Sequence, residues 1–258
     1  MNDKEYDAMQ GVRRSDLWHM KKSPAHMKYF LEHDTPDSPA LLFGRAYHKW
    51  ILENKSFFDE FYVIPSVNRR TKEGRAILEQ IAAENAGKQG IESSDLETIK
   101  EMAAALDANP ETAAYRALID SGKARTEVPF VWIDKDTGEM CKVKADMIID
   151  ERAEIVDFKT AISCEDGAFE RASLKYGYNY QAAFYTEGID ICTMEKHTFT
   201  FIAQEKTPPY AARVYECDEG FIDEGRTIFH LFLRRFHNCR MAEEWPGYES
   251  QLLIAGGK

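Results

Sequence analysis

The run CKVKADMIIDERAEIVDFKT, residues 141–160, reads as two strands joined by a short turn, and it decides the fold. Successive side chains of a strand point to opposite faces of the sheet. In the second strand, Val156 and Phe158 therefore share one face. Asp157 and Lys159 share the other face. The pattern predicts a hairpin that carries a carboxylate and an ammonium group side by side.

The first strand of this hairpin alternates in the same way between residues 141 and 149. Its apolar set is Val143, Ala145, Met147 and Ile149. Its more polar set is Lys142, Lys144, Asp146 and Ile148. If the turn is centred between Glu151 and Arg152, Asp146 lies directly opposite Asp157.

Directly opposed side chains in an antiparallel pair have Cβ atoms roughly 5 Å apart, and like charges there are destabilising. A divalent cation between Asp146 and Asp157 would offset the repulsion, and Lys159 beside them suits a charged phosphate. The alternative interpretation is a surface hairpin with solvated charges, which is the usual state of acidic residues near turns. Taken alone, the hairpin leaves both interpretations open.

The composition is that of an ordinary globular protein, with 258 residues of which 44% are hydrophobic. No stretch approaches ~20 uninterrupted apolar residues, and the N-terminus lacks the apolar segment of a secretory signal, so we expect a cytoplasmic protein. The five cysteines include no CxxC pair, which argues against zinc ribbons and clustered iron–sulfur ligands. No repeat or linker is visible. We expect one domain over residues 1–258, with a core of about 15–240 and a loosely ordered tail from about 247.

The net charge of −11 argues against a surface that binds nucleic acid everywhere, but it permits a local basic groove. One candidate is the run NRRTKEGR, which contains Arg69, Arg70, Lys72 and Arg75. These side chains could contact phosphates, or they could belong to a solvated loop and helix start.

The N-terminal half is predicted to be mainly helical. The expected helices cover residues 15–32 with a break at Ser23-Pro24, 40–53, 74–87, 94–109 and 111–122, and a short strand is expected at 61–66. His48 lies one position past the apolar stripe of the second helix, at an edge that could face a cleft. A lone histidine at such an edge is also commonly structural.

The C-terminal half is predicted to begin with three strands in a meander, at residues 126–134, 138–150 and 153–160. A helix should start near Tyr180 and end at Gly188, and Gln181 and Tyr185 share one face of it. A strand at 195–205 and a helix at 218–241 complete the pattern. The order predicts an α/β fold with a mixed central sheet flanked by helices and a helical N-terminal half.

One family of proteins presents these residues in this order. The series His48, Asp146, Asp157-Phe158-Lys159, Gln181 and Tyr185 resembles the RecB-type branch of the PD-(D/E)XK nuclease superfamily, whose fold is restriction-endonuclease-like. The strings SPAHMKYF, LLFGRAYHKWILE, RRTKEGRA and YNYQAAFY are similar to the RecE-like nuclease domain of phage-type exonuclease VIII, over about residues 15–240. Each motif alone is weak, but their order is specific.

The resemblance implies a metal centre in the predicted hairpin. Asp146 and Asp157 would coordinate Mg²⁺ or Mn²⁺, and the backbone carbonyl of Phe158 would add an oxygen ligand. His48 would line the site, with ligation of a second metal ion as one role open to it. The motif around Asp146 reads KADM and lacks the glycine that many relatives carry before this aspartate, so the local backbone is expected to differ.

The resemblance also implies roles for the residues around the metal. Lys159 would orient or activate the attacking water, and Gln181 and Tyr185 would hold the hairpin and the substrate strand in place. The first candidates for phosphate contact would be Arg45, Arg69, Arg70, Lys72 and Arg75.

Glu127 stays outside this expected site, because two registers of the preceding hairpin are open. If the loop DKDTG is centred on Asp136, Glu127 pairs with Ala145 and faces away from Asp146. A register half a step later pairs Glu127 with Asp146 itself.

The activity that the resemblance implies is degradation of linear double-stranded DNA from its ends, 5′ to 3′, to leave 3′ single strands for recombination through an annealing partner of RecT type. RecE-like domains form ring-shaped tetramers, which would place positive residues in a channel and negative ones outside. Two alternatives remain. One is an endonuclease or single-strand nuclease on the same fold, and the other is a catalytically silent DNA-binding or assembly subunit, against which the complete set Asp146, Asp157 and Lys159 argues.

Overall fold

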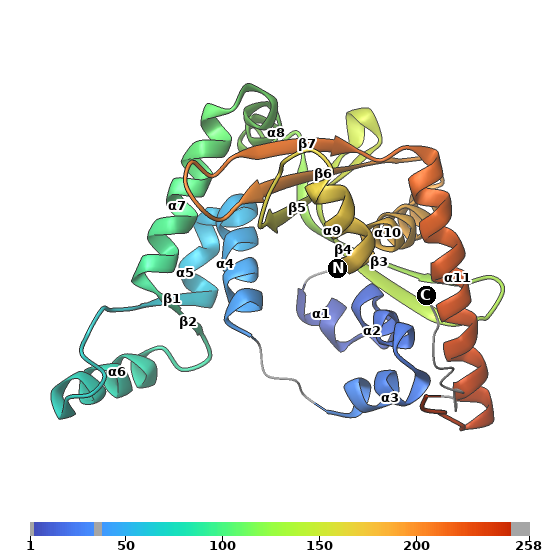
Figure 1. Cartoon of the computed structure of the whole chain (residues 1–258), viewed down its shortest axis with the longest axis horizontal. Coiled ribbons are helices and arrows are strands. Elements are labelled where there is room, and N and C mark those ends of the chain that lie inside the picture. Colours follow the sequence, from blue (N-terminus) through green and yellow to red (C-terminus); the bar gives the residue numbers. More distant parts are fainter. Residues whose placement is uncertain (1–2, 34–37, 249–258) are drawn as a thin grey trace, which may run out of the picture.

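A five-stranded mixed sheet forms the centre of the molecule, as Figure 1 shows for the computed structural model, which describes residues 3–33 and 38–248. The strand order is β3-β4-β5-β6-β7, and only β5 and β6 run parallel. The strands are β3 (Arg125–Ile133), β4 (Met140–Ile149), β5 (Glu154–Ala161), β6 (Thr198–Glu205) and β7 (Ala212–Glu216). The expected mixed sheet flanked by helices is confirmed.

Helices cover both faces of this sheet and form a separate hydrophobic core on each side. Phe184 and Phe229 are fully buried in the first core, and Tyr47 and Met102 in the second. The first layer contains α2 (Arg14–Trp18), the 3₁₀ helix η1 (His19–Lys21), α3 (Pro24–Glu32), α10 (Tyr178–Thr193) and α11 (Glu219–Ala242). The second layer contains α4 (Pro39–Glu53), α7 (Ser93–Ala108) and α8 (Pro110–Asp120).

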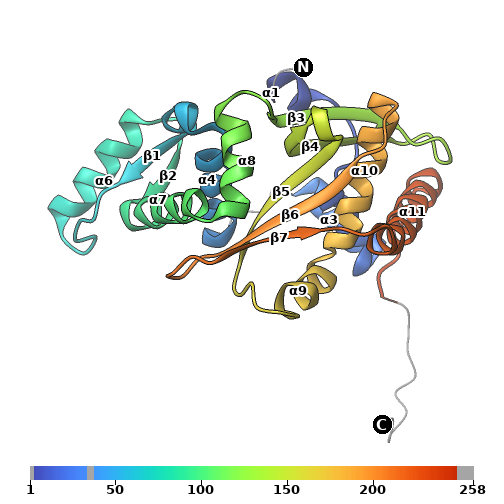
Figure 2. The same ribbon diagram turned by 90° about the horizontal axis from the view of Figure 1, so that it is seen from above.

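A smaller unit projects from one end of the molecule (Figures 1 and 2). Strands β1 (Phe61–Ile64) and β2 (Gln89–Glu92) pair in parallel, and helix α6 (Lys72–Glu84) connects them. We call residues 65–88 the arm. The remaining elements are α1 (Asp3–Ala8), η2 (Asn54–Ser56), α5 (Phe57–Glu60), η3 (Asp150–Arg152) and α9 (Ala168–Tyr176).

The predicted register of the β4–β5 hairpin is confirmed. Met147 pairs with Val156 and Ile149 with Glu154, so the turn is centred between residues 151 and 152. The predicted apolar face of β4 is wrong in one respect, because its members are divided between the two cores. Val143 belongs to the first core and Met147 to the second. This change of side occurs at the position of Asp146, where the ladder with β3 is interrupted.

The helix expected to end at Gly188 continues to Thr193, so this prediction is wrong. Gly188 is buried within α10, and a Cβ atom there would lie 2.4 Å from Cζ3 of Trp132 on β3. The glycine therefore permits close packing of the helix on the sheet rather than a helix end. Strand β2 and helices α1 and α9 were not predicted.

One expectation concerns residues that the structure does not fully describe. The tail expected from about residue 247 lies outside the described ranges from residue 249 onward. Within residues 3–33 and 38–248, no helix is both long and apolar enough to cross a membrane.

Candidate active site

Asp146 and Asp157 lie where strands β4 and β5 separate. The last pair of the ladder is Met147 with Val156, so the two aspartates occupy the next position in the same register. Both are buried, with 9% and 1% of their surfaces exposed. Asp146 Oδ2 accepts a hydrogen bond from the backbone N–H of Phe158, with a distance of 2.9 Å. The hairpin thus brings two carboxylates together out of bulk water.

The two carboxylates have different electrostatic environments. Burial raises the pKa of Asp157 to about 6, although the neighbouring Lys159 ammonium acts in the opposite direction. Burial would also raise the pKa of Asp146, but the charge of His48 and its contact outweigh this and hold the pKa below its usual value. Two acids with pKa values shifted in opposite directions are typical of a functional site.

Asp157 has a partner for each of its carboxylate oxygens. Its Oδ2 accepts a hydrogen bond of 2.6 Å from Gln181 Nε2. Its Oδ1 is buried and forms an ion pair with the Lys159 ammonium. The lysine supplies the positive charge that balances this carboxylate in the cleft.

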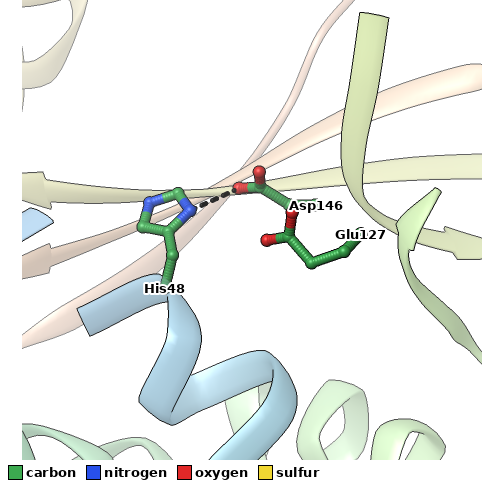
Figure 3. Close-up of side chains that lie close together, drawn as sticks. All are labelled: His48, Glu127 and Asp146. Carbon is green, nitrogen blue, oxygen red and sulfur yellow. Dashed lines mark ion pairs between the residues drawn. The ribbon is translucent and has the colours of Figure 1, made fainter. Parts of the chain in front are cut away.

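His48 points from helix α4 toward Asp146 on strand β4 (Figure 3). Ser38 caps the helix through the N–H of Leu41, and buried Tyr47 anchors it by donating to Gln204 Oε1 at 2.8 Å. His48 Nδ1 then lies 3.2 Å from Asp146 Oδ2. Burial acts to lower the pKa of His48, but the Asp146 carboxylate raises it above its usual value. His48 thus lies at the edge of the apolar stripe and faces the cleft, as predicted.

Glu127 belongs to this cluster, although we left it out of the expected site. Thr126 pairs with Met147 and Val128 with Ala145, so the register places Glu127 opposite Asp146. Glu127 has a φ of 50°, in the left-handed region, which interrupts the ladder at this point. Its carboxylate, the imidazole of His48 and the Asp146 carboxylate have ligand atoms within 4.8 Å of one another (Figure 3). Of the two registers that the sequence left open, the later one pairs Glu127 with Asp146, and it would have placed Glu127 in the expected site.

Helix α10 supplies the other wall of the cleft. Gly177, with a φ of 67°, precedes the helix, and Trp18 packs where its Cβ atom would be. Gln181 and Tyr185, one turn apart, line the same pocket as Asp157 and Lys159. Tyr178 was not predicted, but its ring lies 5.5 Å from the Lys159 ammonium and lines the cleft.

The predicted phosphate contacts divide into two groups. Arg45 on α4 lines the cleft beside His48 and donates to Gln89 Oε1 at 3.0 Å. The other four are exposed on the arm, outside the residues that line the cleft; they are Arg69, Arg70, Lys72 and Arg75. Further basic residues that were not among the predicted phosphate contacts line the cleft near strands β4 and β5; they include Arg13, Arg14, Lys142 and Lys144.

The donor set fits a divalent cation. Asp146 and Asp157 supply buried carboxylate oxygens from the adjacent strands β4 and β5. The backbone carbonyl of Phe158 follows directly in the sequence. Oxygen ligands of this kind suit Mg²⁺ and Mn²⁺.

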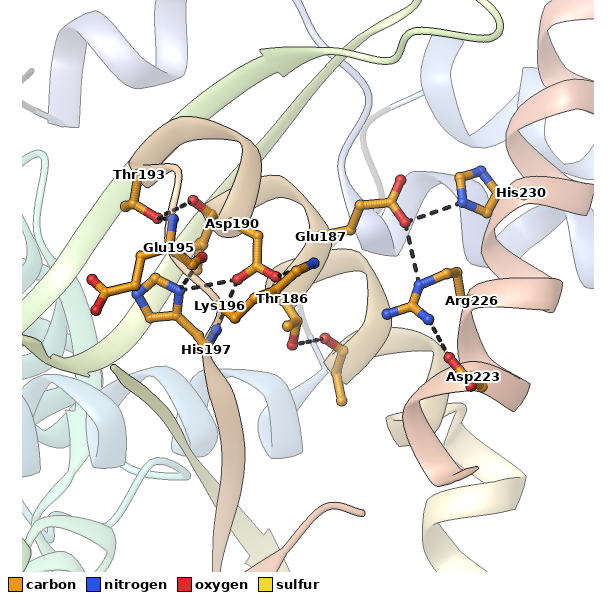
Figure 4. A network of polar contacts seen from close by, with 12 residues as sticks. Thr186, Glu187, Asp190, Thr193, Glu195, Lys196, His197, Asp223, Arg226 and His230 are labelled. Carbon is orange, nitrogen blue, oxygen red and sulfur yellow. Dashed lines mark hydrogen bonds and ion pairs between the residues drawn. The ribbon is translucent and has the colours of Figure 1, made fainter. Parts of the chain in front are cut away.

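Another group of metal-ligating side chains lies away from the cleft, where Asp134, Glu187 and His230 have ligand atoms within 4.8 Å of one another. His230 Nε2 already contacts Glu187 Oε2 at 3.1 Å, and Arg226 contacts the same oxygen at 3.5 Å (Figure 4). Glu187 and His230 are thus already paired with each other, and Asp134 Oδ1 accepts hydrogen bonds from Thr137.

Two solved structures align with this chain. A "Putative exonuclease" from Eubacterium rectale aligns with a TM-score of 0.64 and 15% identity over 100% of this chain and 96% of its own. At this identity the likeness concerns the fold alone. A phage related exonuclease from Haemophilus somnus 129PT aligns with a TM-score of 0.38 and 12% identity over 93% of this chain and 100% of its own. No curated protein sequence matches the chain.

A family model identifies the protein family of the chain, which the shared fold alone does not. Residues 14–253 match the model described as "PDDEXK-like domain of unknown function (DUF3799)". The match covers nearly the whole chain, and the expected PD-(D/E)XK assignment is confirmed. The chain therefore belongs to the DUF3799 family of PDDEXK-like domains.

Proposed function

We propose that this chain is a metal-dependent DNA exonuclease that degrades linear duplex from its ends, 5′ to 3′, and leaves 3′ single strands. The observation that carries the proposal is the arrangement of Asp146, Asp157 and Lys159 in one cleft. Membership of a PDDEXK-like family supports the same chemistry.

The residues of the cleft have separate tasks in this proposal. Asp146, Asp157 and the Phe158 carbonyl would hold Mg²⁺ or Mn²⁺, which supplies Lewis-acid stabilisation of phosphate charge when bound. Lys159 orients the attacking water and offsets charge on the scissile phosphate. His48 fixes the Asp146 carboxylate through their 3.2 Å contact.

Helix α10 positions the metal ligands and the substrate. Gln181 holds Asp157 by donating to its Oδ2 at 2.6 Å, which restricts the carboxylate to one orientation. Tyr185 lies one turn further along the wall and would contact the substrate strand. Burial keeps the Tyr185 pKa well above its usual value, so its hydroxyl remains a hydrogen-bond donor.

The wider setting is also part of the proposal. We propose that the chain acts as a single domain in the cytoplasm of a bacterial host, as a homo-oligomer such as a ring-shaped tetramer, and that the strand it leaves passes to an annealing protein of RecT type. A ring would reconcile the net charge of −11 with a DNA substrate, because basic side chains could face the channel.

Metal removal and substrate topology test the proposed function together. With Mg²⁺, wild-type protein should digest 5′-labelled linear duplex and leave a covalently closed circle of the same sequence intact. EDTA should abolish digestion, and added Mg²⁺ should restore it. Cleavage of the circle would identify an endonuclease, digestion of single strands alone would change the substrate, and no cleavage with any divalent ion would contradict the enzyme assignment.

Arginine substitutions test the proposed DNA contacts. Arg45→Ala should weaken duplex binding and reduce the slope of log affinity against log salt by about 1, because one phosphate contact is lost. Arg70→Ala on the arm should have the same effect if the arm contacts flanking duplex. Fluorescence anisotropy in an Asp157→Asn background measures both without cleavage. Lys196→Ala, which removes an exposed cation outside the cleft, is the matched control. An unchanged affinity and slope for either arginine would remove it from the interface.

A further inference from the structure

Two tyrosines flank the corner between helices α9 and α10. Tyr176 ends α9 and Tyr178 begins α10, with Gly177 between them. Gly177 has a φ of 67°, in the left-handed region, and Trp18 occupies the place of its missing Cβ atom. Arg14 donates to the backbone carbonyl of Tyr176 and, at 2.9 Å, to that of Gly177. Two neighbouring side chains therefore hold the backbone that carries both rings.

The two rings form a short row that leads outward from Lys159. The ring of Tyr178 lines the cleft, and its centroid lies 5.5 Å from Lys159 Nζ. The centroid of the Tyr176 ring lies 6.0 Å from that of Tyr178, with an angle of 32° between the rings. Tyr178 is half-buried, whereas Tyr176 is 44% exposed and lies outside the set of described residues that line the cleft. The row thus begins in the cleft and ends at the surface.

The hydrophobic core accounts for the inner ring but not for the outer one. Tyr178 packs against Phe169 and Phe201 of the first core, with centroids 5.6 and 5.4 Å away. Tyr176 belongs to neither core. A single exposed aromatic ring is common on protein surfaces. A pair of rings whose inner member lies in a cleft is a surface of the kind on which unpaired bases stack.

Positive side chains accompany the rings. Lys175 Nζ lies 5.0 Å from the centroid of the Tyr176 ring, and Lys159 Nζ lies beside the ring of Tyr178. Proteins that bind single-stranded nucleic acid combine cations, which contact the phosphates, with aromatic rings, which stack on the bases. The row of tyrosines therefore has both features that one unpaired strand requires.

We propose that Tyr176 and Tyr178 stack on unpaired bases of the DNA strand whose phosphate lies at Lys159. The inference rests on the proposed function, because it requires a DNA strand in the cleft. The cleft has a volume of about 520 Å³, which admits a single strand but not a duplex. A strand that enters it must separate from its partner, and the two rings replace the stacking that its bases lose.

Binding of single strands with and without bases tests this inference. In the Asp157→Asn background, Tyr176→Ala should weaken binding of a fluorescein-labelled oligothymidylate roughly tenfold or more, measured by anisotropy. The same substitution should leave binding of an abasic oligomer of equal length and charge unchanged, because no base remains to stack. It should also leave the slope of log affinity against log salt unchanged, because the ring carries no charge.

Three further variants define what the contact requires. Tyr176→Phe should keep full affinity, because the ring is retained. Tyr176→Leu, which keeps an apolar side chain without a ring, should behave like Tyr176→Ala and tests the inference even if the alanine variant unfolds. Tyr29→Ala on α3 removes another exposed ring, outside the residues that line the cleft, and is the matched control. Circular dichroism establishes that each variant is folded.

The two oligomers make the test decisive. Unchanged affinity of Tyr176→Ala for oligothymidylate, or an equal loss on the abasic oligomer, would overturn the inference. The binding measurement is also independent of cleavage. Base-dependent binding through Tyr176 without DNA digestion by the wild type would refute the proposed nuclease and leave the stacking site standing. Digestion by the wild type with unchanged affinity of Tyr176→Ala would overturn the stacking site alone.

Discussion

Asp157→Asn is expected to lower hydrolysis of linear duplex by ~10³-fold or more, and at the same time to stabilise the metal-free protein. Activity should fall because an amide oxygen is a poor replacement for a charged metal ligand. The free energy of unfolding should rise because burial disfavours the charged form of this carboxylate. Its pKa, raised to about 6, corresponds to about 1–3 kcal/mol at neutral pH.

The amide can keep one of the two contacts of the carboxylate, the hydrogen bond from Gln181. Gln181 Nε2 donates to Asp157 Oδ2, and the asparagine oxygen can accept the same hydrogen bond. Lys159 loses its ionic partner, but 18% of its side chain is exposed and its ammonium lies near the ring of Tyr178. Urea unfolding in EDTA, combined with digestion of labelled duplex in Mg²⁺, measures the two effects on one preparation.

A second aspartate, with 9% of its side chain exposed, provides the control. Asp190 on α10 accepts a hydrogen bond from the backbone N–H of His197 at 3.0 Å through Oδ1, and its Oδ2 lies 3.0 Å from Lys196 Nζ (Figure 4). Asp190→Asn should therefore lower the free energy of unfolding and leave hydrolysis unchanged. If Asp157→Asn also destabilised the metal-free protein, the aspartate would be a structural residue rather than a strained ligand.

The sequence predicts the centre of this site better than its surroundings. The β4–β5 register follows from the two-residue period of a strand and a short turn, and both are local features. His48 lies where the edge of a helical stripe predicts it. Glu127 could not be placed, because a left-handed residue within a strand depends on what packs around it. The same is true of Gly188, which reads as a helix end and instead accommodates Trp132.

The positions of charged side chains are still harder to predict. The run NRRTKEGR has the composition of a phosphate-binding loop, yet the structure places it on the arm, away from the residues that line the cleft. Basic residues at the cleft come instead from segments such as Arg13-Arg14 and strand β4. Local composition shows that cations are close in sequence, but the topology determines which of them face the site.

Packing of α11 against α10 gives the largest expected effect on stability outside the site. Gly225 lies where the two helices are closest, and a Cβ atom there would be 2.0 Å from the carbonyl oxygen of Asn179. Backbone cannot yield as a flexible side chain would, so Gly225→Ala should lower the free energy of unfolding by about 2–3 kcal/mol. Thermal unfolding followed by circular dichroism should show a melting temperature roughly 5–10 °C lower.

The same substitution should also reach the active site, because Asn179 lies two residues before Gln181 at the start of α10. A shift of this turn would lengthen the 2.6 Å hydrogen bond from Gln181 to Asp157. Because the metal ligand would then be less well oriented, kcat should fall by roughly tenfold. Arg45 and the arm should stay in place. Gly220→Ala in the same helix is the matched control, since its Cβ atom would meet only Asp218 Oδ1 at an ordinary 3.5 Å. It should leave kcat unchanged and alter stability by less than about 1 kcal/mol. Equal stability of the two variants would show that α10 and α11 can move apart without strain. The position of Gln181 would then not depend on the packing of these two helices.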